Sequence, residues 1–152
     1  MTVSALSAAK TLCEMRGWAL SNMALQKVLY LAQMFRLGQS EGTPLVREPF
    51  EAWDYGPVVP DLYHRVKPFG SGPVGNVFHW VDEVEQNTAD YRALEQAEEG
   101  TRRLSPGQLV AITHRSGGAW ARHYLPGARG VVIPNEDILR EYRLRSAEGA
   151  VA

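Results

Sequence analysis

Apolar residues recur at intervals of three and four positions along much of this chain, which is the spacing of one face of an α-helix. The clearest run lies between residues 22 and 38, where one apolar stripe consists of Leu25, Val28, Leu29, Ala32 and Phe35. Ser21 or Asn22 is a suitable residue to begin this helix, and Gly38 is expected to end it. The pattern predicts a core helix over this stretch.

Weaker patterns with the same spacing predict further helices. They cover residues 3–16, 58–66, 88–99, 105–114, 120–124 and 135–145. Ser105 and Gln108 have the spacing of a capping box, which begins a helix. Asn135 is expected to cap the last helix, because Glu136 and Asp137 then lie near its positive end. Most of the chain is therefore predicted to be helical.

One stretch between the helices has the composition of a β-strand. Residues 50–55 are rich in aromatic side chains, and Gly56-Pro57 ends the run. The alternating residues 77–81 (VFHWV) predict a partner strand. No internal repeat or long linker divides the chain. We therefore expect a mainly α, compact single-domain helical bundle with a small β-hairpin (α+β), spanning residues 1–152.

The composition is that of a folded globular protein, with 45% hydrophobic and 22% charged residues. The formal net charge of −1 does not favour nucleic acid or an anionic membrane as a partner. Cys13 is the single cysteine, which excludes an internal disulfide and predicts a small buried apolar residue. No apolar run approaches the ~18 residues of a membrane span, and the first residues lack a signal-peptide pattern. We expect a cytoplasmic protein with no membrane partner.

Charge is distributed unevenly along the second half of the chain. Residues 82–99 contain seven acids and one base, whereas residues 102–145 contain eight arginines and three acids. This charge distribution allows two interpretations. The segments form solvated faces that attract each other within the fold, or they form a charged surface that steers a partner of opposite polarity.

Two short motifs imitate enzyme signatures without the context that those signatures need. Residues 38–42 (GQSEG) have the spacing of a nucleophile elbow around Ser40, but they follow a predicted helix rather than a buried strand. Residues 70–75 (GSGPVG) have the spacing of a phosphate-binding turn, but no strand precedes them and Pro73 removes a backbone donor. The four histidines lack the spacing of metal ligands. We expect no enzyme activity, no cofactor and no metal.

The first two predicted helices, separated by Gly17, suggest a DNA-binding alternative. This arrangement imitates a helix-turn-helix, so a DNA-binding regulator is the second hypothesis for function. A recognition helix needs a polar, basic face that reaches bases and phosphates. Residues 22–36 are mainly apolar, which favours a packed core helix instead.

A more specific combination involves segments far apart in the sequence. It consists of residues 25–33 (LQKVLYLAQ), residues 50–60 (FEAWDYGPVVP), Thr113-His114 and the later Trp120. This combination resembles the Panacea domain family, also described as GepA-like phage-associated proteins, to which SocA-like antitoxins belong. The resemblance covers residues 5–145, and Val28 and Leu31 depart from the commoner Leu and Tyr of the family pattern.

The resemblance implies that the protein acts by binding another protein. Members of this family are antitoxins that neutralise varied small protein toxins by direct contact, so a cognate protein toxin is the implied partner. In the SocA-like mode the antitoxin is a proteolytic adaptor that delivers its toxin to the ClpXP protease, and ClpX is then a second partner. Many other antitoxins only block their toxins, and no feature of this sequence separates the two modes.

The residues that carry the resemblance divide into scaffold and candidate contacts. We expect the scaffold to include Leu25, Leu29, Tyr30, Trp53, Gly56, Pro57, Pro60, Thr113, His114 and Trp120. The candidate partner-binding residues are Gln26, Lys27, Asp54, Tyr55 and Arg65. Gln26 and Lys27 are expected on the flanks of the core helix, within reach of a neighbouring loop, and Trp53 and Tyr55 on one face of a strand.

Overall fold

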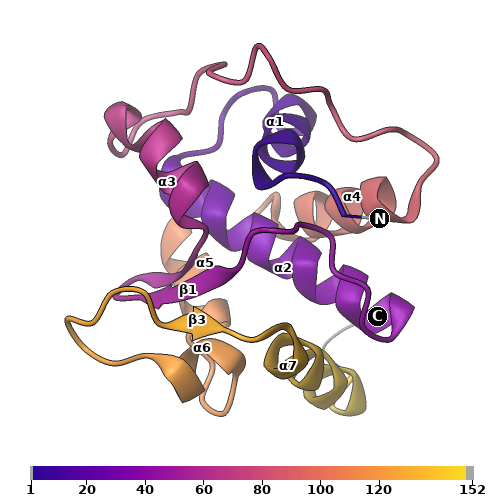
Figure 1. Cartoon of the computed structure of the whole chain (residues 1–152), viewed down its shortest axis with the longest axis vertical. Coiled ribbons are helices and arrows are strands. Elements are labelled where there is room, and N and C mark those ends of the chain that lie inside the picture. The colour runs from indigo at the N-terminus through magenta and orange to yellow at the C-terminus, as the bar shows by residue number, and fades with distance from the viewer. Residues whose placement is uncertain (1, 150–152) are drawn as a thin grey trace.

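Helix α2 (Asn22–Ser40) runs through the middle of the protein, and the other elements pack around it (Figure 1). In this computed structural model, which describes residues 2–149, every residue from 24 to 34 is buried. Ser21 caps the helix by accepting a hydrogen bond from the Ala24 N–H. The sequence pattern predicted one buried stripe, whereas the middle turns of α2 are buried on all sides.

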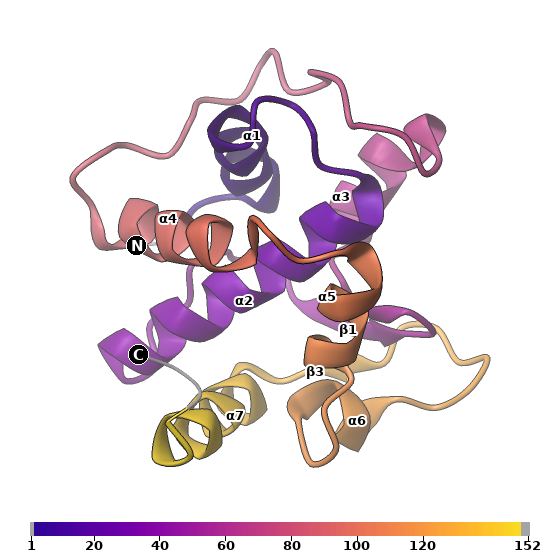
Figure 2. The same ribbon diagram turned by 180° about the vertical axis from the view of Figure 1, so that it is seen from behind.

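Three of the longer helices contact α2. Helices α1 (Ala5–Met15) and α4 (Ala89–Thr101) lie on one side of it, and α7 (Asn135–Ala147) lies on the other (Figures 1 and 2). Arg36 donates to Asp90 of α4 at 2.7 Å, and Gln33 donates to Asn135 of α7 at 3.1 Å. Polar side chains of α2 therefore hold neighbours on both of these sides.

Shorter helices complete the bundle. Helices α3 (Pro60–Val66) and α5 (Pro106–Thr113) contact α2, and α6 (Ala119–His123) packs against α7 and the sheet. A single 3₁₀ turn, η1 (Lys67–Phe69), follows α3. The segment after it passes over α1 (Figures 1 and 2), where the Val84 N–H donates to Thr11 Oγ1 at 2.8 Å.

The sheet has three short antiparallel strands in the order β2-β1-β3. They are β1 (Phe50–Trp53), β2 (Gly56–Val58) and β3 (Val132–Ile133). The prediction of a second strand over residues 77–81 was wrong, because this segment lies in the irregular stretch that crosses α1. β1 pairs instead with the residues that follow its own turn and with a segment about eighty positions later.

The predicted fold class is confirmed. Residues 2–149 form seven α-helices and a small antiparallel sheet, and the predicted capping box at Ser105 and Gln108 is present with both of its hydrogen bonds. Several predicted boundaries were wrong. Residues 56–58 form β2 rather than the end of a strand and the start of a helix, so α3 begins at Pro60. α2 continues through Gly38 to Ser40, and Pro134 rather than Asn135 occupies the cap of α7. The Asn135 side chain is engaged by Gln33, so it does not serve the helix end.

The two oppositely charged segments do not simply pair with each other. In the acidic segment, Glu98 forms ion pairs with Arg16 and Arg102, and of these two only Arg102 belongs to the arginine-rich segment. Glu83 pairs with Lys10, and Asp90 with Arg36. The acidic segment is therefore held largely by bases of the first two helices.

Candidate functional site

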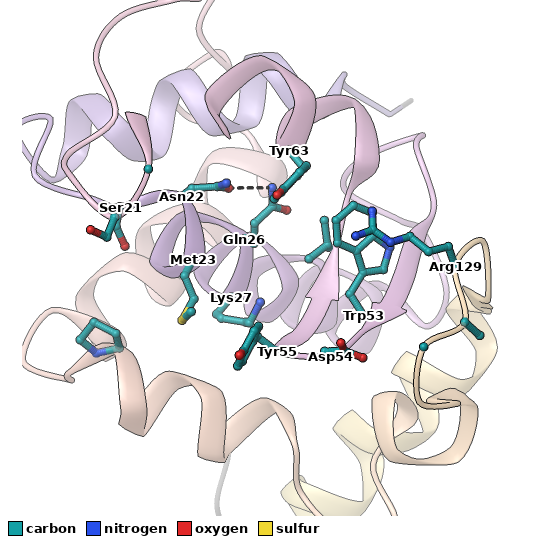
Figure 3. Close-up of a pocket in the computed structure, with 16 residues that line it drawn as sticks. Ser21, Asn22, Met23, Gln26, Lys27, Trp53, Asp54, Tyr55, Tyr63 and Arg129 are labelled. Carbon is teal, nitrogen blue, oxygen red and sulfur yellow. Dashed lines mark hydrogen bonds between the residues drawn. The ribbon is translucent and has the colours of Figure 1, made fainter. Parts of the chain in front are cut away.

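A cavity of about 640 Å³ opens beside the first turns of α2 (Figure 3). Its lining comes from the N-terminus of α2, the β1–β2 turn, α3, the start of α5 and residues 127–129. This volume is in the range of small-ligand sites, which are usually concave and mostly apolar with a few polar groups. Figure 3 shows Lys27 in the middle of the lining, with Trp53 and Arg129 on one side of it.

Lys27 is the unusual group of this cavity. It is 1% exposed, and its Nζ donates to the Pro57 carbonyl oxygen at 3.2 Å. Burial lowers the pKa of the Lys27 ammonium to about 7, because the charged form is desolvated. The lysine is therefore partly neutral near physiological pH.

Gln26, also 1% exposed, joins the same helix to the strand region. Its Oε1 accepts a hydrogen bond from the Val59 N–H at 3.0 Å, and its Nε2 donates to Asn22 at 3.2 Å. Gln33, two turns later, accepts from the backbone N–H groups of Leu45 and Val46. These amides replace the water that the buried backbone would otherwise need.

Trp53 forms the aromatic wall of the cavity. Its ring meets Tyr63 edge-on, with ring centroids 4.8 Å apart, and the Arg129 guanidinium lies 4.4 Å from its centroid. The Trp53 indole N–H donates to Glu51 at 2.9 Å, and its carbonyl accepts from the Trp120 indole at 2.7 Å. These contacts fix the ring from several elements.

A stack of three rings lies between α5 and α6. His114 lies flat on Trp120 with centroids 3.6 Å apart, and Trp120 lies on Tyr124 at 4.5 Å. Burial and the Lys27 charge lower the pKa of His114, against a backbone hydrogen bond with Tyr55 that raises it. His114 Nε2 is buried without a hydrogen-bond partner in the described part of the chain. The Thr113-His114 and Trp120 elements of the sequence are thus structural neighbours.

The structure brings four of the five candidate contact residues together. Gln26, Lys27, Asp54 and Tyr55 line the cavity, while Arg65 lies elsewhere with its guanidinium 4.4 Å from the centroid of the Trp80 ring. The expectation that the first two lie on the helix flanks was wrong, because α2 is buried on all sides there, although both do reach the neighbouring strand region. Their contact with a partner remains a prediction.

The face shared by Trp53 and Tyr55 was also predicted incorrectly. β1 ends at Trp53, and Tyr55 lies in the following turn, 68% exposed. Asp54, in the same turn, accepts a hydrogen bond from the Tyr124 hydroxyl at 2.7 Å, which raises the pKa of Tyr124. The turn therefore presents an acidic and an aromatic side chain at the edge of the cavity.

Sequence reasoning missed several cavity residues. Tyr63 and Arg129 belong to segments without a recognisable motif, and Ser21 was identified only as a helix cap.

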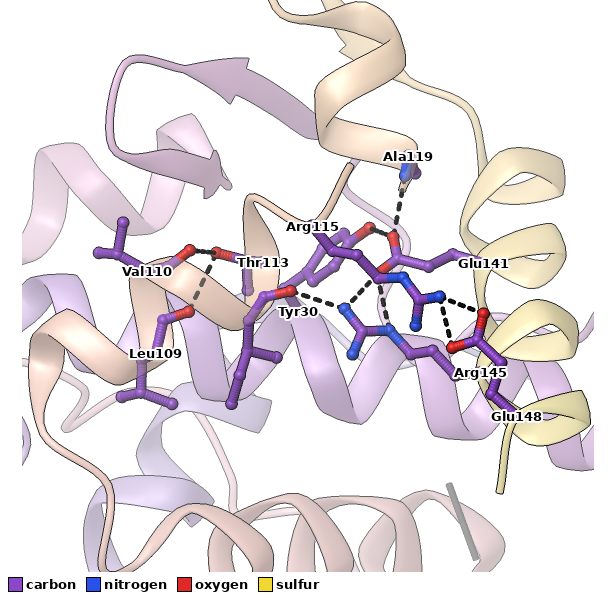
Figure 4. Close-up of polar contacts among 10 residues, drawn as sticks. Tyr30, Leu109, Val110, Thr113, Arg115, Ala119, Glu141, Arg145 and Glu148 are labelled. Atoms are coloured by element: carbon purple, nitrogen blue, oxygen red, sulfur yellow. Dashed lines mark hydrogen bonds and ion pairs between the residues drawn. The ribbon is translucent and has the colours of Figure 1, made fainter. Parts of the chain in front are cut away.

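The sequence pattern also gave no sign of the role of Glu141, which lies outside the cavity lining. Glu141 is 1% exposed and accepts hydrogen bonds from the Tyr30 hydroxyl, the Ala119 N–H and Arg145 (Figure 4). Burial raises the pKa of Tyr30 well above its ordinary value, and the charge of Glu141 and its hydrogen bond to Tyr30 raise it further.

The two enzyme-like motifs lie in structural positions unlike those of the enzymes. Ser40 is in the last turn of α2, and its hydroxyl donates to the Arg36 carbonyl at 2.6 Å. Residues 70–75 follow η1 and do not begin a helix, although Gly70 and Ser71 contribute to the cavity. No three His, Cys, Asp or Glu side chains within residues 2–149 are arranged to hold a metal ion. No helix in that range could cross a lipid bilayer.

The DNA-binding alternative requires α2 to be a recognition helix. Its middle turns are buried against α1, α4, α5, α7 and β2, so that part of the helix cannot enter a DNA groove. The packed-helix interpretation of this stretch is confirmed.

Comparison with known proteins gives a family match. Residues 25–121 match the family described as "Antitoxin SocA-like, Panacea domain". The curated protein "Antitoxin SocA" of Caulobacter vibrioides (strain NA1000 / CB15N) is 34% identical over 110 residues, which is 66% of this chain and 58% of that protein. The chain thus spans less than two thirds of this relative's length. No solved structure is significantly similar to the chain.

Proposed function

This chain belongs to the antitoxin SocA-like family with a Panacea domain, and from that premise we propose that it binds a cognate protein toxin and neutralises it without a catalytic step. The family match over residues 25–121 carries the proposal. Ten of the sixteen residues that line the cavity lie within that stretch, in α2, the sheet, α3 and the segments that follow it. The proposal therefore places the toxin contact near this part of the surface.

The character of this surface supports protein binding. Tyr55 is 68% exposed at the cavity edge, next to the aromatic wall formed by Trp53 and Tyr63. Aromatic and arginine side chains dominate the energetics of many protein interfaces. A cavity with an aromatic wall and an exposed aromatic edge fits an anchor site for a partner side chain.

Co-expression with the adjacent reading frame tests this function. We expect a stable complex on co-purification and restored growth of cells in which that reading frame alone is toxic. A Tyr55→Ala and Trp53→Ala double variant that folds should lose rescue, whereas Gly100→Ala, at a position outside the cavity lining, should retain it. Absence of both complex and rescue with the unaltered chain would refute the proposal.

The adaptor mode is a finer version of the same function. In that mode the chain delivers its toxin to ClpXP, so purified ClpXP with ATP should degrade the toxin several-fold faster when this chain is added. An inactive ClpX variant serves as the control. An unchanged degradation rate together with intact toxin binding would leave simple blocking as the mode.

A further inference from the structure

Lys27 is a buried amine whose charged form the protein does little to stabilise. Among residues 2–149 its Nζ makes one hydrogen bond, to the Pro57 carbonyl, whereas an ammonium carries three donors. No ion pair to Lys27 forms within residues 2–149. Burial lowers the pKa of this group to about 7, because it desolvates the charged form. Lys27 lines the cavity although it is only 1% exposed, so a negative charge held in the cavity would stabilise the ammonium by Coulomb attraction.

The rest of the lining also favours one negative charge. Two bases, Lys27 and Arg129, face a single acid, Asp54, whose carboxylate already accepts a hydrogen bond from Tyr124. The N-terminal ends of α2 and α5 also border the cavity, and helix N-termini carry partial positive charge. One buried ammonium balances a monoanionic carboxylate better than a phosphate, which carries more charge.

The apolar part of the lining identifies what should carry that carboxylate. Trp53 and Tyr63 provide an aromatic wall inside the cavity, and Tyr55 extends the aromatic surface outward. A ligand that fills the cavity would therefore continue onto the protein surface, as a segment of a protein does and a small free acid does not. We propose that the cavity receives a carboxylate carried beside an apolar side chain on a bound protein, with Lys27 as its counter-ion. The identification of that protein as the toxin rests on the proposed function above.

Short acidic peptides test the cavity without any toxin. The probes are acetyl-Phe-Glu-amide, with a side-chain carboxylate, and acetyl-Ala-Phe with a free C-terminal carboxylate, against acetyl-Phe-Gln-amide and acetyl-Ala-Phe-amide as neutral controls. We expect at least one acidic probe to bind saturably in a ¹H–¹⁵N NMR titration, with shifts at the signals of Lys27, Tyr55 and Gly70. Its neutral counterpart should bind at least tenfold more weakly. The acidic probe that binds shows whether the source is a side chain or a chain end.

Two variants distinguish a specific effect of the Lys27 charge from an effect of the overall positive charge of the protein. Lys27→Met keeps the length of the side chain and removes the buried charge, so it should fold, and it should weaken acidic-probe binding at least tenfold. Arg143→Ala removes an exposed cation of α7, which contributes no residue to the cavity lining, and should leave that binding unchanged. Equal binding of acidic and neutral probes, no binding of either acidic probe at millimolar concentration, or full binding by folded Lys27→Met would overturn the proposal.

A toxin experiment keeps the two proposals distinguishable. If co-expression yields a complex, Lys27→Met should raise its dissociation constant at least tenfold while its NMR spectrum retains the dispersion of a folded chain. Peptide binding without any toxin complex would leave the cavity proposal standing and refute the proposed function. A toxin complex whose dissociation constant is unaffected by Lys27→Met would support the proposed function and refute the cavity proposal.

Discussion

The side chain of Lys27 occupies the space that a side chain at Gly56 would need. A Cβ on Gly56 would lie 2.6 Å from Lys27 Cε and 3.1 Å from Thr113 Oγ1. Gly56 also has a φ of +120°, a conformation that residues with a side chain rarely adopt. Gly56 at the start of β2 and Lys27 of the central helix are therefore packed directly against each other, although they lie about thirty positions apart.

Gly56→Ala should lower the free energy of unfolding by about 2–4 kcal/mol, because it adds both a steric overlap and backbone strain. Gly117→Ala is the matched control, since its φ is +80° and a Cβ there would meet no atom of the described residues beyond its chain neighbours within 4 Å. It should cost about 1–2 kcal/mol from strain alone. Urea denaturation measures both. The double variant Gly56→Ala/Lys27→Ala should recover part of the free energy of unfolding that Gly56→Ala loses. Strict additivity of the two changes would contradict a steric overlap between Lys27 and a side chain at position 56.

Lys27 should make stability rise with pH. Its folded pKa of about 7 is below the ordinary lysine value of 10.5, so the unfolded chain binds more protons between these two pH values. The free energy of unfolding therefore gains from this group as pH rises through that window, by about 2–3 kcal/mol between pH 6 and pH 9. Lys27→Met removes the titrating group. The free energy of unfolding of wild type, measured by urea denaturation, should therefore rise over that pH range relative to that of the variant. A difference that stays constant with pH would show that Lys27 keeps an ordinary pKa.

Two glycines in helices should respond to alanine in opposite directions. A Cβ on Gly38 of α2 would lie 2.1–2.3 Å from the ring of Tyr142, so Gly38→Ala should destabilise the protein by about 1–3 kcal/mol. A Cβ on Gly100 of α4 would have no atom of another described element within 4 Å. Gly100→Ala should therefore stabilise the protein by up to about 1 kcal/mol through helix propensity. Thermal unfolding followed by circular dichroism compares them. Stabilisation by both would mean that the Tyr142 ring moves aside freely.

Two carboxylates of the C-terminal region should differ sharply in importance. Glu141→Gln leaves Arg145, whose side chain is 11% exposed, without its buried counter-charge, and should cost about 3–5 kcal/mol. Glu148 pairs with Arg115 at the surface, and Glu148→Gln should change stability little, because exposed ion pairs contribute little. Chemical denaturation of both variants checks this, and similar effects of the two changes would count against a structural role for the Glu141 network.

The sequence alone determined the features that depend on neighbouring residues. Helical spacing predicted each α-helix, the spacing of Ser105 and Gln108 predicted a capping box, and the aromatic run before Gly56 predicted β1. These signals are readable because helix hydrogen bonds and caps link residues at most four positions apart. The family resemblance was readable for a related reason, since its motifs are short and continuous.

Only the tertiary structure decided the features that depend on distant segments. β1 pairs with β3 rather than with residues 77–81, because strand pairing joins segments at any separation and a local pattern cannot choose between them. The burial of Lys27 is a second case, since an apolar stripe predicts one buried face, whereas helices and strands enclose α2 on several sides. The cavity is a third, because its lining gathers residues from positions 21 to 129, and only packing brings their charges and rings together.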